Sequence, residues 1–376
     1  MRIAIPTEIR PGETRVAATP ETIKKLTAGP SPTVAVQAGA GAGARIADED
    51  FKAAGATIVA TAAEVYTDAD LLLKVRGPDS CELAMLRPGT IVAGLLAPHD
   101  RAGLDALAAR GVTAFALERL PRITRAQTMD VLSSQANIAG YKAVILAANE
   151  YGRFMPMLMT AAGTVKAARV LVLGAGVAGL QAIATAKRLG AVIEAFDVRP
   201  ATKEQVESLG AKFVEVPVSD EERRQAETAG GYAREMSEDY QRRQAALIDE
   251  RARVADIVIT TALVPGRPAP ILLREDTVRS MKPGAVIVDL GVEQGGNCPL
   301  TEKDRVVVKH GVTLVGYSNL PAMLAADASA LYARNLLAFV NLLIDRKSGT
   351  LTINREDEII AGALVCADGH VVMPET

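Results

Sequence analysis

Residues 168–199 read ARVLVLGAGVAGLQAIATAKRLGAVIEAFDVR, and this stretch decides the fold. The apolar run Arg169–Leu173 predicts a buried strand, and a helical pattern and a second apolar strand follow it. The turn between the first strand and the helix contains three glycines in GxGxxG spacing, Gly174, Gly176 and Gly179. Asp197 comes eighteen residues after the last glycine, at the end of the second strand. This order of strand, glycine turn, helix, strand and acidic residue is typical of a dinucleotide-binding domain.

Each of the three glycines has a physical role in binding a pyrophosphate. Gly174 permits the tight turn, Gly176 lets the pyrophosphate approach the backbone, and Gly179 lets the helix pack close to the strand. The helix N-terminus offers unpaired N–H groups and the positive end of its dipole. Asp197 would accept hydrogen bonds from the adenosine ribose, which favours NAD(H), although Arg199 nearby could hold the 2′-phosphate of NADP(H). The alternative is an α/β protein that uses these glycines only for packing.

Strands and helical patterns alternate on both sides of this unit. Apolar runs predict strands at residues 2–5, 33–37, 57–59, 71–75, 90–96, 212–216, 256–262, 285–290 and 313–315. Strands separated by helical segments of about 10–15 residues predict βαβ units. We therefore expect an α/β protein with two domains built on parallel sheets, one of them a Rossmann-type dinucleotide-binding domain.

Length and helical patterns set the expected domain boundaries. A chain of 376 residues suggests two domains. A long helical pattern over 128–159 would connect them, and a last amphipathic helix, Ala330–Leu343, would pack onto the first domain. We expect an α/β domain at 1–138 that is completed by 320–376, and an NAD(H)-binding domain at 139–319.

Composition argues against several classes of function. Lys and Arg (42) nearly balance Asp and Glu (44), so we expect no nucleic-acid partner. Only three His and three well-separated Cys occur, which argues against a metal site or a disulfide framework and favours a reducing, cytoplasmic setting. The longest uncharged windows, 28–44 and 170–186, are interrupted by glycine and predict no membrane helix.

A polar insert interrupts the second series of strands and helices. Fifteen of the 33 residues from Ser219 to Arg251 are charged, which is typical of a solvated helix pair. Its centre reads AGGYAREM, and the Gly-Gly-Tyr there would suit the hinge and aromatic tip of a mobile lid.

A dehydrogenase that oxidises an alcohol or amine needs a proton acceptor near the nicotinamide, and this sequence offers few. His99 lies in a loop-like segment and His310 and His370 lie near turns, which favours exposed surface histidines. Lys74 follows a buried apolar run, where it would either hold a substrate carboxylate or extend its ammonium group to solvent.

A polar loop precedes the long helix and contains Arg122, Gln127 and Asp130. An Arg–carboxylate pair could fix this loop in one conformation. Spacing alone favours a simpler interpretation, in which the loop caps the helix and forms a surface ion pair.

Long motifs throughout the chain resemble the alanine dehydrogenase/transhydrogenase family. The motifs are RPGETRVAATPE (10–21), PRITRAQTMDVLSSQANIAGYKAV (121–144), MTAAGTVKAARVLVLGAGVAGLQAIATAKRLGA (159–191), DVRPATKEQVESLGAKF (197–213), AETAGGYAREM (226–236), ITTALVPGRPAP (259–270) and DLGVEQGGNCPL (289–300). Their length makes the resemblance specific, and they cover essentially the whole chain.

Within this family, the motifs are most similar to those of the NAD(H)-binding component of proton-translocating transhydrogenases. The resemblance implies an oxidoreductase component that passes hydride between its NAD(H) and NADP(H) bound on a separate partner component. It implies that a membrane-spanning partner subunit couples this transfer to proton translocation. It further implies a cytoplasmic homodimer that lies on the cytoplasmic face of the bacterial inner membrane through its partner subunits.

The resemblance also implies which residues form the site. Arg122, Gln127 and Asp130 would position the nicotinamide and its ribose, with Ser133 close by. The expected cofactor-binding residues are Arg122, Ile123, Thr124, Gln127, Gly174, Gly176, Val177, Gly179, Asp197, Val198, Arg199, Gly231, Tyr232, Gln244 and Leu263. Three of these, Gly231, Tyr232 and Gln244, fall on a loop that closes over the nucleotide in this family.

Two alternatives stay open, an alanine dehydrogenase-like amino-acid oxidoreductase and a non-catalytic NAD(H) sensor. Alanine dehydrogenase needs a histidine where Leu95 stands, and the aspartate expected before QGG is Glu293 here. Arg15 and Lys74, which that enzyme uses on its substrate carboxylate, are both present. Direct hydride transfer between two nicotinamides moves no substrate proton, so it requires proximity and orientation rather than a general base. The shortage of histidine therefore favours the transhydrogenase component.

Overall fold

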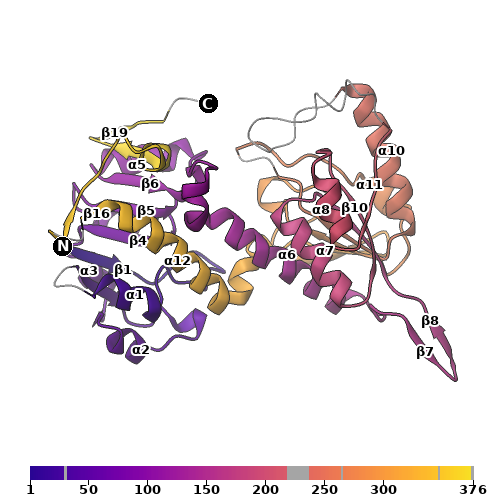
Figure 1. The fold of residues 1–376 in the computed structure, drawn as a ribbon, viewed down its shortest axis with the longest axis horizontal. Coiled ribbons are helices and arrows are strands. Elements are labelled where there is room, and N and C mark those ends of the chain that lie inside the picture. The colour runs from indigo at the N-terminus through magenta and orange to yellow at the C-terminus, as the bar shows by residue number, and fades with distance from the viewer. Residues whose placement is uncertain (29–31, 218–236, 264–265, 346–347, 374–376) are drawn as a thin grey trace. The chain divides into compact units, whose positions relative to one another are not determined.

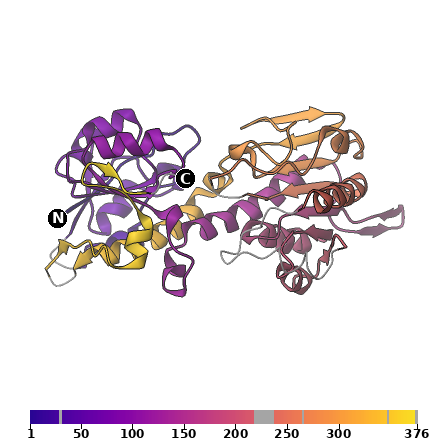
Figure 2. The same cartoon turned by 90° about the horizontal axis from the view of Figure 1, so that it is seen from above.

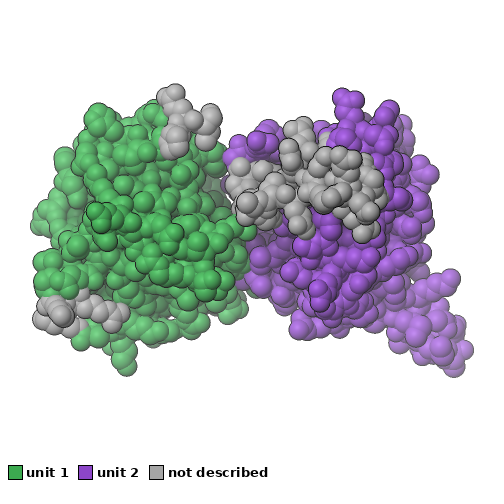
Figure 3. All heavy atoms as spheres, turned by 45° about the horizontal axis from the view of Figure 1, so that its top comes forward, with its two compact units in different colours: residues 1–135, 321–376 green, residues 136–320 purple. Residues whose placement is uncertain are grey.

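The computed structural model describes residues 1–28, 32–217, 237–263, 266–345 and 348–373. The chain forms two compact units, unit 1 from residues 1–135 and 321–376 and unit 2 from residues 136–320 (Figure 3). Each unit has its own sheet and its own buried apolar clusters. The predicted class, an α/β protein with two parallel-sheet domains of which one is Rossmann-type, is confirmed.

Unit 1 is built on an eight-stranded sheet with the order β19-β18-β6-β5-β4-β1-β2-β3. Its parallel strands are β1 (Arg2–Ile5), β2 (Thr33–Gln37), β3 (Thr57–Val59), β4 (Leu71–Arg76), β5 (Ile91–Leu95) and β6 (Thr113–Ala116). The C-terminal strands β18 (Leu364–Ala367) and β19 (His370–Val371) extend it in antiparallel pairing beyond β6. The yellow C-terminal elements accordingly lie beside the purple strands of unit 1 in both ribbon views (Figures 1 and 2).

Helices complete the core of unit 1. They are α1 (Pro20–Leu26), α2 (Asp48–Ala53), α3 (Ala62–Tyr66), α4 (Ser80–Met85), α5 (Arg101–Ala109), α12 (Ala325–Leu343) and α13 (Glu358–Ala363), with 3-10 turns η1 (Ala42–Ala44), η2 (Leu117–Arg119) and η3 (Thr124–Met129). Helix α12 packs against the sheet, and its Phe339 meets Phe115 of β6 edge-on with ring centroids 5.3 Å apart. The C-terminal segment therefore supplies both strands and core residues to unit 1.

Unit 2 is built on a seven-stranded sheet with the order β11-β10-β9-β12-β13-β15-β14. Its parallel strands are β9 (Arg169–Leu173), β10 (Val192–Phe196), β11 (Lys212–Phe213), β12 (Ile257–Thr260), β13 (Val286–Asp289) and β15 (Val312–Val315). The edge strand β14 (Val306–Lys309) pairs antiparallel with β15. Side chains of β9 alternate between two apolar clusters, Val170 and Val172 in one and Leu171 and Leu173 in the other. The sheet is therefore buried on both faces, which explains its unbroken apolar runs.

The helices of unit 2 include the one that follows the glycine turn. They are α7 (Val177–Arg188), α8 (Thr202–Ser208), α10 (Glu238–Val254) and α11 (Glu275–Arg279), with the 3-10 turn η4 (Val292–Gln294). The C-terminal half of the predicted polar insert is the single helix α10, whereas the rest of the insert, including Gly231 and Tyr232, lies outside the described residues. Among the described residues, no helix combines the length and apolar character needed to cross a bilayer.

The connecting helix is shorter than predicted. Helix α6 spans Val131–Glu150, and the chain then forms the hairpin of β7 (Leu158–Thr160) and β8 (Gly163–Val165) instead of continuing as a helix to Met159. Pro156 has no backbone N–H to donate within a helix, and Gly163 adopts φ +131°, which a tight reversal requires. The prediction over 151–159 was wrong because the apolar residues there are exposed rather than buried: Met157 is 63% and Met159 is 71% exposed.

Candidate functional site

The sheet of unit 2 has a topological switch point between β9 and β12. Strand β10 pairs on one side of β9 and β12 pairs on the other, all parallel. The connections that leave the carboxyl ends of these two strands therefore diverge and open a crevice between them, which is where ligands bind in doubly wound sheets. Residues 174–176, 197–199 and 261–263 follow the three strands at this edge.

The three glycines form the turn at this switch point. Gly174 has φ +103°, and a Cβ there would stand 2.6 Å from Oγ1 of Thr261. A Cβ on Gly179 would overlap the carbonyl oxygen of Gly174, so the first and third glycines are required by the protein itself. A Cβ on Gly176 would meet only Nη2 of Arg199, at 3.8 Å. The second glycine therefore leaves the backbone open to a ligand.

Helix α7 begins at the glycine turn, with Gly176 as its N-cap residue. No side chain of the described residues caps this end, and its first turn contains no acidic residue. The helix runs for twelve residues, so its N-terminus combines unpaired N–H donors with the positive end of a full dipole. The arrangement fits a phosphate group.

Asp197 joins the glycine turn to the segment after β10. Its side chain is 6% exposed. Its Oδ2 accepts hydrogen bonds from the backbone N–H of Ala175 at 2.7 Å and from Nη2 of Arg199 at 2.8 Å. Its Oδ1 accepts from the backbone N–H and from Nε of Arg199, both at 2.9 Å.

These contacts bear on the choice between NAD(H) and NADP(H). A carboxylate has about four acceptor positions, and here all four bonds come from the protein. A ribose hydroxyl that binds Asp197 must therefore compete with the guanidinium of Arg199. That guanidinium lies beside Gly176, at the turn where a pyrophosphate would bind.

Two apolar side chains at this edge are exposed, which is unusual next to a buried sheet. Val177 is 40% and Leu263 is 38% exposed. Apolar side chains around a few polar groups are typical of a pocket that binds a flat ring. Val198 is half-buried and packs on the core, and Gln244 is half-buried on α10. Of the expected cofactor-binding residues described in unit 2, all except Gln244 lie in the connections around the switch point.

The polar loop of unit 1 caps helix α6, as the spacing predicted. Oδ1 of Asp130 accepts from the backbone N–H of Ser133 at 2.9 Å and Oδ2 accepts from its hydroxyl at 2.6 Å. The surface ion pair is formed by Arg125 with Asp357 of the C-terminal segment, at 2.7 Å, and this contact lowers the pKa of Asp357. Arg122 and Gln127 are exposed on the same loop. Ile123 and Thr124 complete the loop, with Ile123 half-buried against the core and Thr124 exposed.

Lys74 and Arg15 lie in a buried ionic cluster of unit 1. Nζ of Lys74 is 2.5 Å from Glu82 and 3.5 Å from Glu8, and the lysine side chain is 1% exposed, so the alternative in which it reaches solvent was wrong. Nη2 of Arg15 is 2.6 Å from Glu13, and its Nη1 donates to Gln135 at 2.8 Å. Burial raises the pKa of Glu8, although Lys74 opposes this effect. Strand β4 continues past Lys74 to Arg76, so the lysine is inside the sheet rather than at its end.

The histidines stand apart from the glycine turn. His99 and His370 are exposed. Nε2 of His310 is 2.9 Å from Glu275, and this hydrogen bond lowers the pKa of Glu275. No group of three potential metal ligands occurs within the residues that the structure describes.

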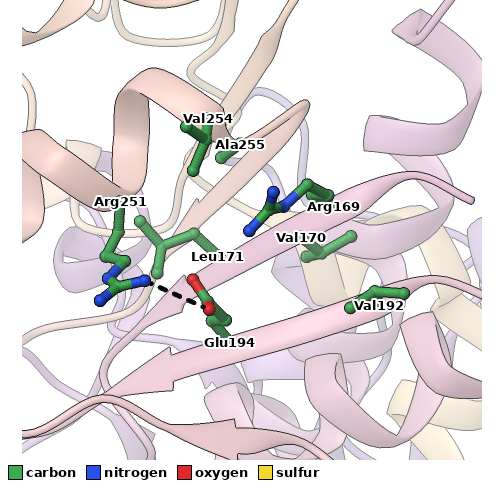
Figure 4. A pocket seen from close by; sticks show the side chains of 8 residues that line it. All are labelled: Arg169, Val170, Leu171, Val192, Glu194, Arg251, Val254 and Ala255. Carbon is green, nitrogen blue, oxygen red and sulfur yellow. Dashed lines mark ion pairs between the residues drawn. The ribbon is translucent and has the colours of Figure 1, made fainter.

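A small crevice in unit 2 lies at the opposite edge of the sheet from the switch point (Figure 4). It is lined by the first residues of β9 and β10, Arg169 and Val192, and by Arg251, which approaches Glu194 to 3.6 Å. Its volume of about 10 Å³ holds about one water molecule. It is too small and too far along the strands to be part of a nucleotide site.

Sequence reasoning missed Thr261, Asp289 and Asn297, which hold the segments around the switch point together. Their signal was present in the motifs ITTALVPGRPAP and DLGVEQGGNCPL, which were used for resemblance and not for chemistry.

Comparison with known proteins matches both halves of the chain to one pair of family models. Residues 4–139 match the model described as alanine dehydrogenase/PNT, N-terminal domain, and residues 143–374 match alanine dehydrogenase/PNT, C-terminal domain. An NAD(P) transhydrogenase subunit alpha from Rhodospirillum rubrum, the first of the parts into which that subunit is divided, is 54% identical over 100% of this chain and 98% of that protein. Alanine dehydrogenase of Mycobacterium tuberculosis is 34% identical, over 99% of this chain and 95% of that protein.

Solved structures give the same pattern. The crystal structure of transhydrogenase from Sinorhizobium meliloti has a TM-score of 0.89 and 49% identity, and the match covers 99% of this chain and 100% of that one. An L-alanine dehydrogenase structure has a TM-score of 0.83 and 26% identity, covering 100% of this chain and 97% of that one.

Proposed function

The chain belongs to the alanine dehydrogenase/PNT family, and we propose that it is the NAD(H)-binding subunit of a proton-translocating NAD(P) transhydrogenase. In this proposal it exchanges hydride with NADP(H) on a partner subunit, and a membrane-spanning partner couples the exchange to proton movement. The single observation that carries NAD(H) binding is the glycine turn at the switch point, joined to a buried Asp197. The names of the relatives at 54% and 47% identity, both transhydrogenase alpha subunits, support the transhydrogenase role.

Residues of unit 2 would hold NAD(H), and bound NADH would supply the hydride. Gly174, Gly176, Gly179 and the N-terminus of α7 would bind the pyrophosphate, because they present backbone N–H groups without side-chain obstruction. Asp197 would bind the adenosine ribose, and Arg199, once its bonds to Asp197 open, would turn toward the pyrophosphate. The exposed Val177 and Leu263 would cover the rings. We propose residues 139–319 as the NAD(H)-binding domain.

The remaining expected residues would orient the nicotinamide and close the site. Arg122, Gln127, Asp130 and Ser133 are proposed as catalytic through orientation, since a hydride transfer between nicotinamides requires aligned carbon atoms and no proton acceptor. The Asp130–Ser133 bonds hold the loop at the start of α6, which supports this role. Ile123, Thr124, Gly231, Tyr232 and Gln244 are proposed as further contacts.

We further propose a homodimer that lies on the cytoplasmic face of the inner membrane through its partner subunits. The hairpin of β7 and β8 supports self-association. It projects from unit 2 (Figure 1), and a two-stranded hairpin is only marginally stable alone. Phe154, Met157 and Met159 next to it or on it are 58%, 63% and 71% exposed, which is an apolar surface suited to a protein interface.

The decisive experiment measures hydride transfer from NADH to an NADP analogue with and without a purified NADP(H)-binding partner. We expect turnover only with the partner. Binding of NADH without turnover in either condition would favour an NAD(H) sensor instead. Replacement of Gln127 by Asn should slow transfer more than it weakens NADH binding, because the residue orients rather than holds the nucleotide.

The second candidate is an alanine dehydrogenase, and the 34% identity with such an enzyme favours it. Against it, Arg15 and Lys74 are buried and each is ion-paired with a glutamate of the chain, so a substrate carboxylate would have to displace Glu13 or Glu82. Oxidation of NADH with pyruvate and ammonia, without any partner, tests this candidate. Robust activity there would refute the transhydrogenase proposal.

A further inference from the structure

Asn297 ties together the two ends of the segment that follows β12. Its Nδ2 donates to the carbonyl oxygens of Ala262 at 2.9 Å and of Pro270 at 2.8 Å. Because only the NH₂ of a carboxamide donates, the side chain can face these two carbonyls in one orientation only. Asn297 is 0% exposed, so the contacts are shielded from water. One side chain thus fixes where the segment leaves the sheet and where it returns.

Asp289 holds Asn297 in place. The carboxylate is fully buried at the end of β13. Its Oδ1 accepts from the backbone N–H of Asn297 at 3.1 Å and of Gly291 at 2.9 Å, and its Oδ2 accepts from the N–H of Cys298 at 3.0 Å. A Cβ on Gly296, which has φ +83°, would stand 2.8 Å from Oδ2, so the turn closes tightly around the carboxylate.

Thr261 connects the same segment to the glycine turn. Its backbone N–H donates to the carbonyl oxygen of Leu173 at 2.8 Å, and its hydroxyl donates to that of Gly174 at 3.0 Å. The chain of contacts therefore runs from Asp289 through Asn297 and Ala262 to the turn after β9. Leu263, 38% exposed, is the next residue along the segment.

We propose that Asn297 is a positioning residue for the nicotinamide half of NAD(H), an inference that rests on the proposed function. In a doubly wound sheet each half of a dinucleotide lies on one side of the switch point. Asp197, after β10, marks the side of the adenosine half. Strand β12 lies on the other side of β9, so the segment that Asn297 fixes, with Leu263, faces the nicotinamide half.

The test compares two probes of the same site, NADH and 5′-AMP, on the full chain. Replacing Asn297 with Asp keeps the shape but points a carboxylate oxygen at two carbonyl oxygens, so the segment should move. We expect the Kd for NADH to rise about tenfold, which corresponds to about 1.4 kcal/mol. The Kd for 5′-AMP should stay within about twofold, because 5′-AMP occupies only the adenosine half.

Two more variants make the comparison decisive. Thr261→Val removes the hydroxyl contact with Gly174 and keeps the side-chain shape, so it should reproduce the selective loss in smaller size, and it decides the matter if Asn297→Asp does not fold. Thr277→Val is the matched control, because it removes a buried hydroxyl that donates to Asp249 elsewhere in unit 2. The control should change neither Kd.

The outcomes separate this inference from the proposed function. A folded Asn297→Asp protein that loses NADH and 5′-AMP affinity equally has only a structural role for Asn297, which overturns the inference. Unchanged NADH affinity overturns it as well. If the unmodified chain binds no NADH, the proposed function fails, and the inference fails with it before any variant is measured.

Discussion

The two units share one strand order but fill its switch point with different residues. The order is β3-β2-β1-β4-β5-β6 in unit 1 and β11-β10-β9-β12-β13-β15 in unit 2, so β1 corresponds to β9 and β4 to β12. Both are the order 3-2-1-4-5-6 of doubly wound folds, which opens a crevice beside the first strand. Topology therefore offers the same place for a ligand twice.

Side chains decide which crevice can bind a nucleotide. In unit 1, Glu8 after β1 and Lys74 in β4 are 2% and 1% exposed and approach each other to 3.5 Å. The first helix after β1 begins only at Pro20, so no helix N-terminus follows the strand directly. In unit 2, glycines and the start of α7 follow β9 at once. Unit 1 closes its crevice with paired charges, whereas unit 2 leaves backbone N–H groups accessible.

The largest expected effect comes from breaking the charge pairing in unit 1. Lys74→Met leaves Glu82 and Glu8 buried without their partner, and we expect the free energy of unfolding to fall by about 3–5 kcal/mol. Chemical denaturation measures this loss. The double variant Lys74→Met/Glu82→Gln should recover part of it, because it removes one unpaired charge. A loss that is equally large in the double variant would contradict the assignment.

The next effect concerns the open glycine of unit 2. Gly176→Ala should leave thermal unfolding nearly unchanged, because its Cβ meets only Nη2 of Arg199 at 3.8 Å. The same methyl group blocks the approach of a pyrophosphate, so we expect NADH affinity to fall about a hundredfold, or about 2.7 kcal/mol. Gly179→Ala is the contrasting variant, since its Cβ overlaps the carbonyl oxygen of Gly174 and should destabilise the fold itself. Normal NADH binding by Gly176→Ala would remove the turn from the site.

A smaller effect is expected at the acidic residue of the same crevice. Asp197→Asn keeps the size of the side chain but loses the charge that holds Arg199 and repels a 2′-phosphate. We expect NADH affinity to fall about tenfold, in the range of a charge-assisted hydrogen bond. The preference for NADH over NADPH should fall with it, as competitive titration would show. Unchanged selectivity would contradict the role of Asp197.

The smallest effect is expected at an exposed charge pair of unit 1, in contrast to its buried cluster. Hydrogen bonds from Arg334 and Lys25 lower the pKa of Glu21 to about 2. A lowered folded-state pKa stabilises the fold above the ordinary value of 4.5 and loses that contribution as the pH falls from there toward 2. Because the pair is exposed, Glu21→Gln should cost at most about 0.5 kcal/mol at pH 7. The difference from the unmodified chain should vanish near pH 2, and a difference that grows toward acid would refute this account.

Much of unit 2 was predictable because its signals are local. The strand Arg169–Leu173 and the three glycines lie next to one another in the sequence, and Asp197 follows within one βαβ unit. The hairpin after α6 was not predictable in the same way. Its apolar residues repeat like those of a buried helix, and only the structure shows that they are exposed.

The sequence alone determined the α/β class, the glycine turn and the acidic residue, because each depends on neighbours within one turn or one strand-helix-strand unit. Only the tertiary structure decided which side chains support that turn. Asn297 reaches Ala262 across 35 residues, and Arg15 reaches Gln135 across 120. Such contacts depend on which strands become neighbours when both faces of a sheet are buried. That choice is made by packing across the whole unit, and no local periodicity encodes it.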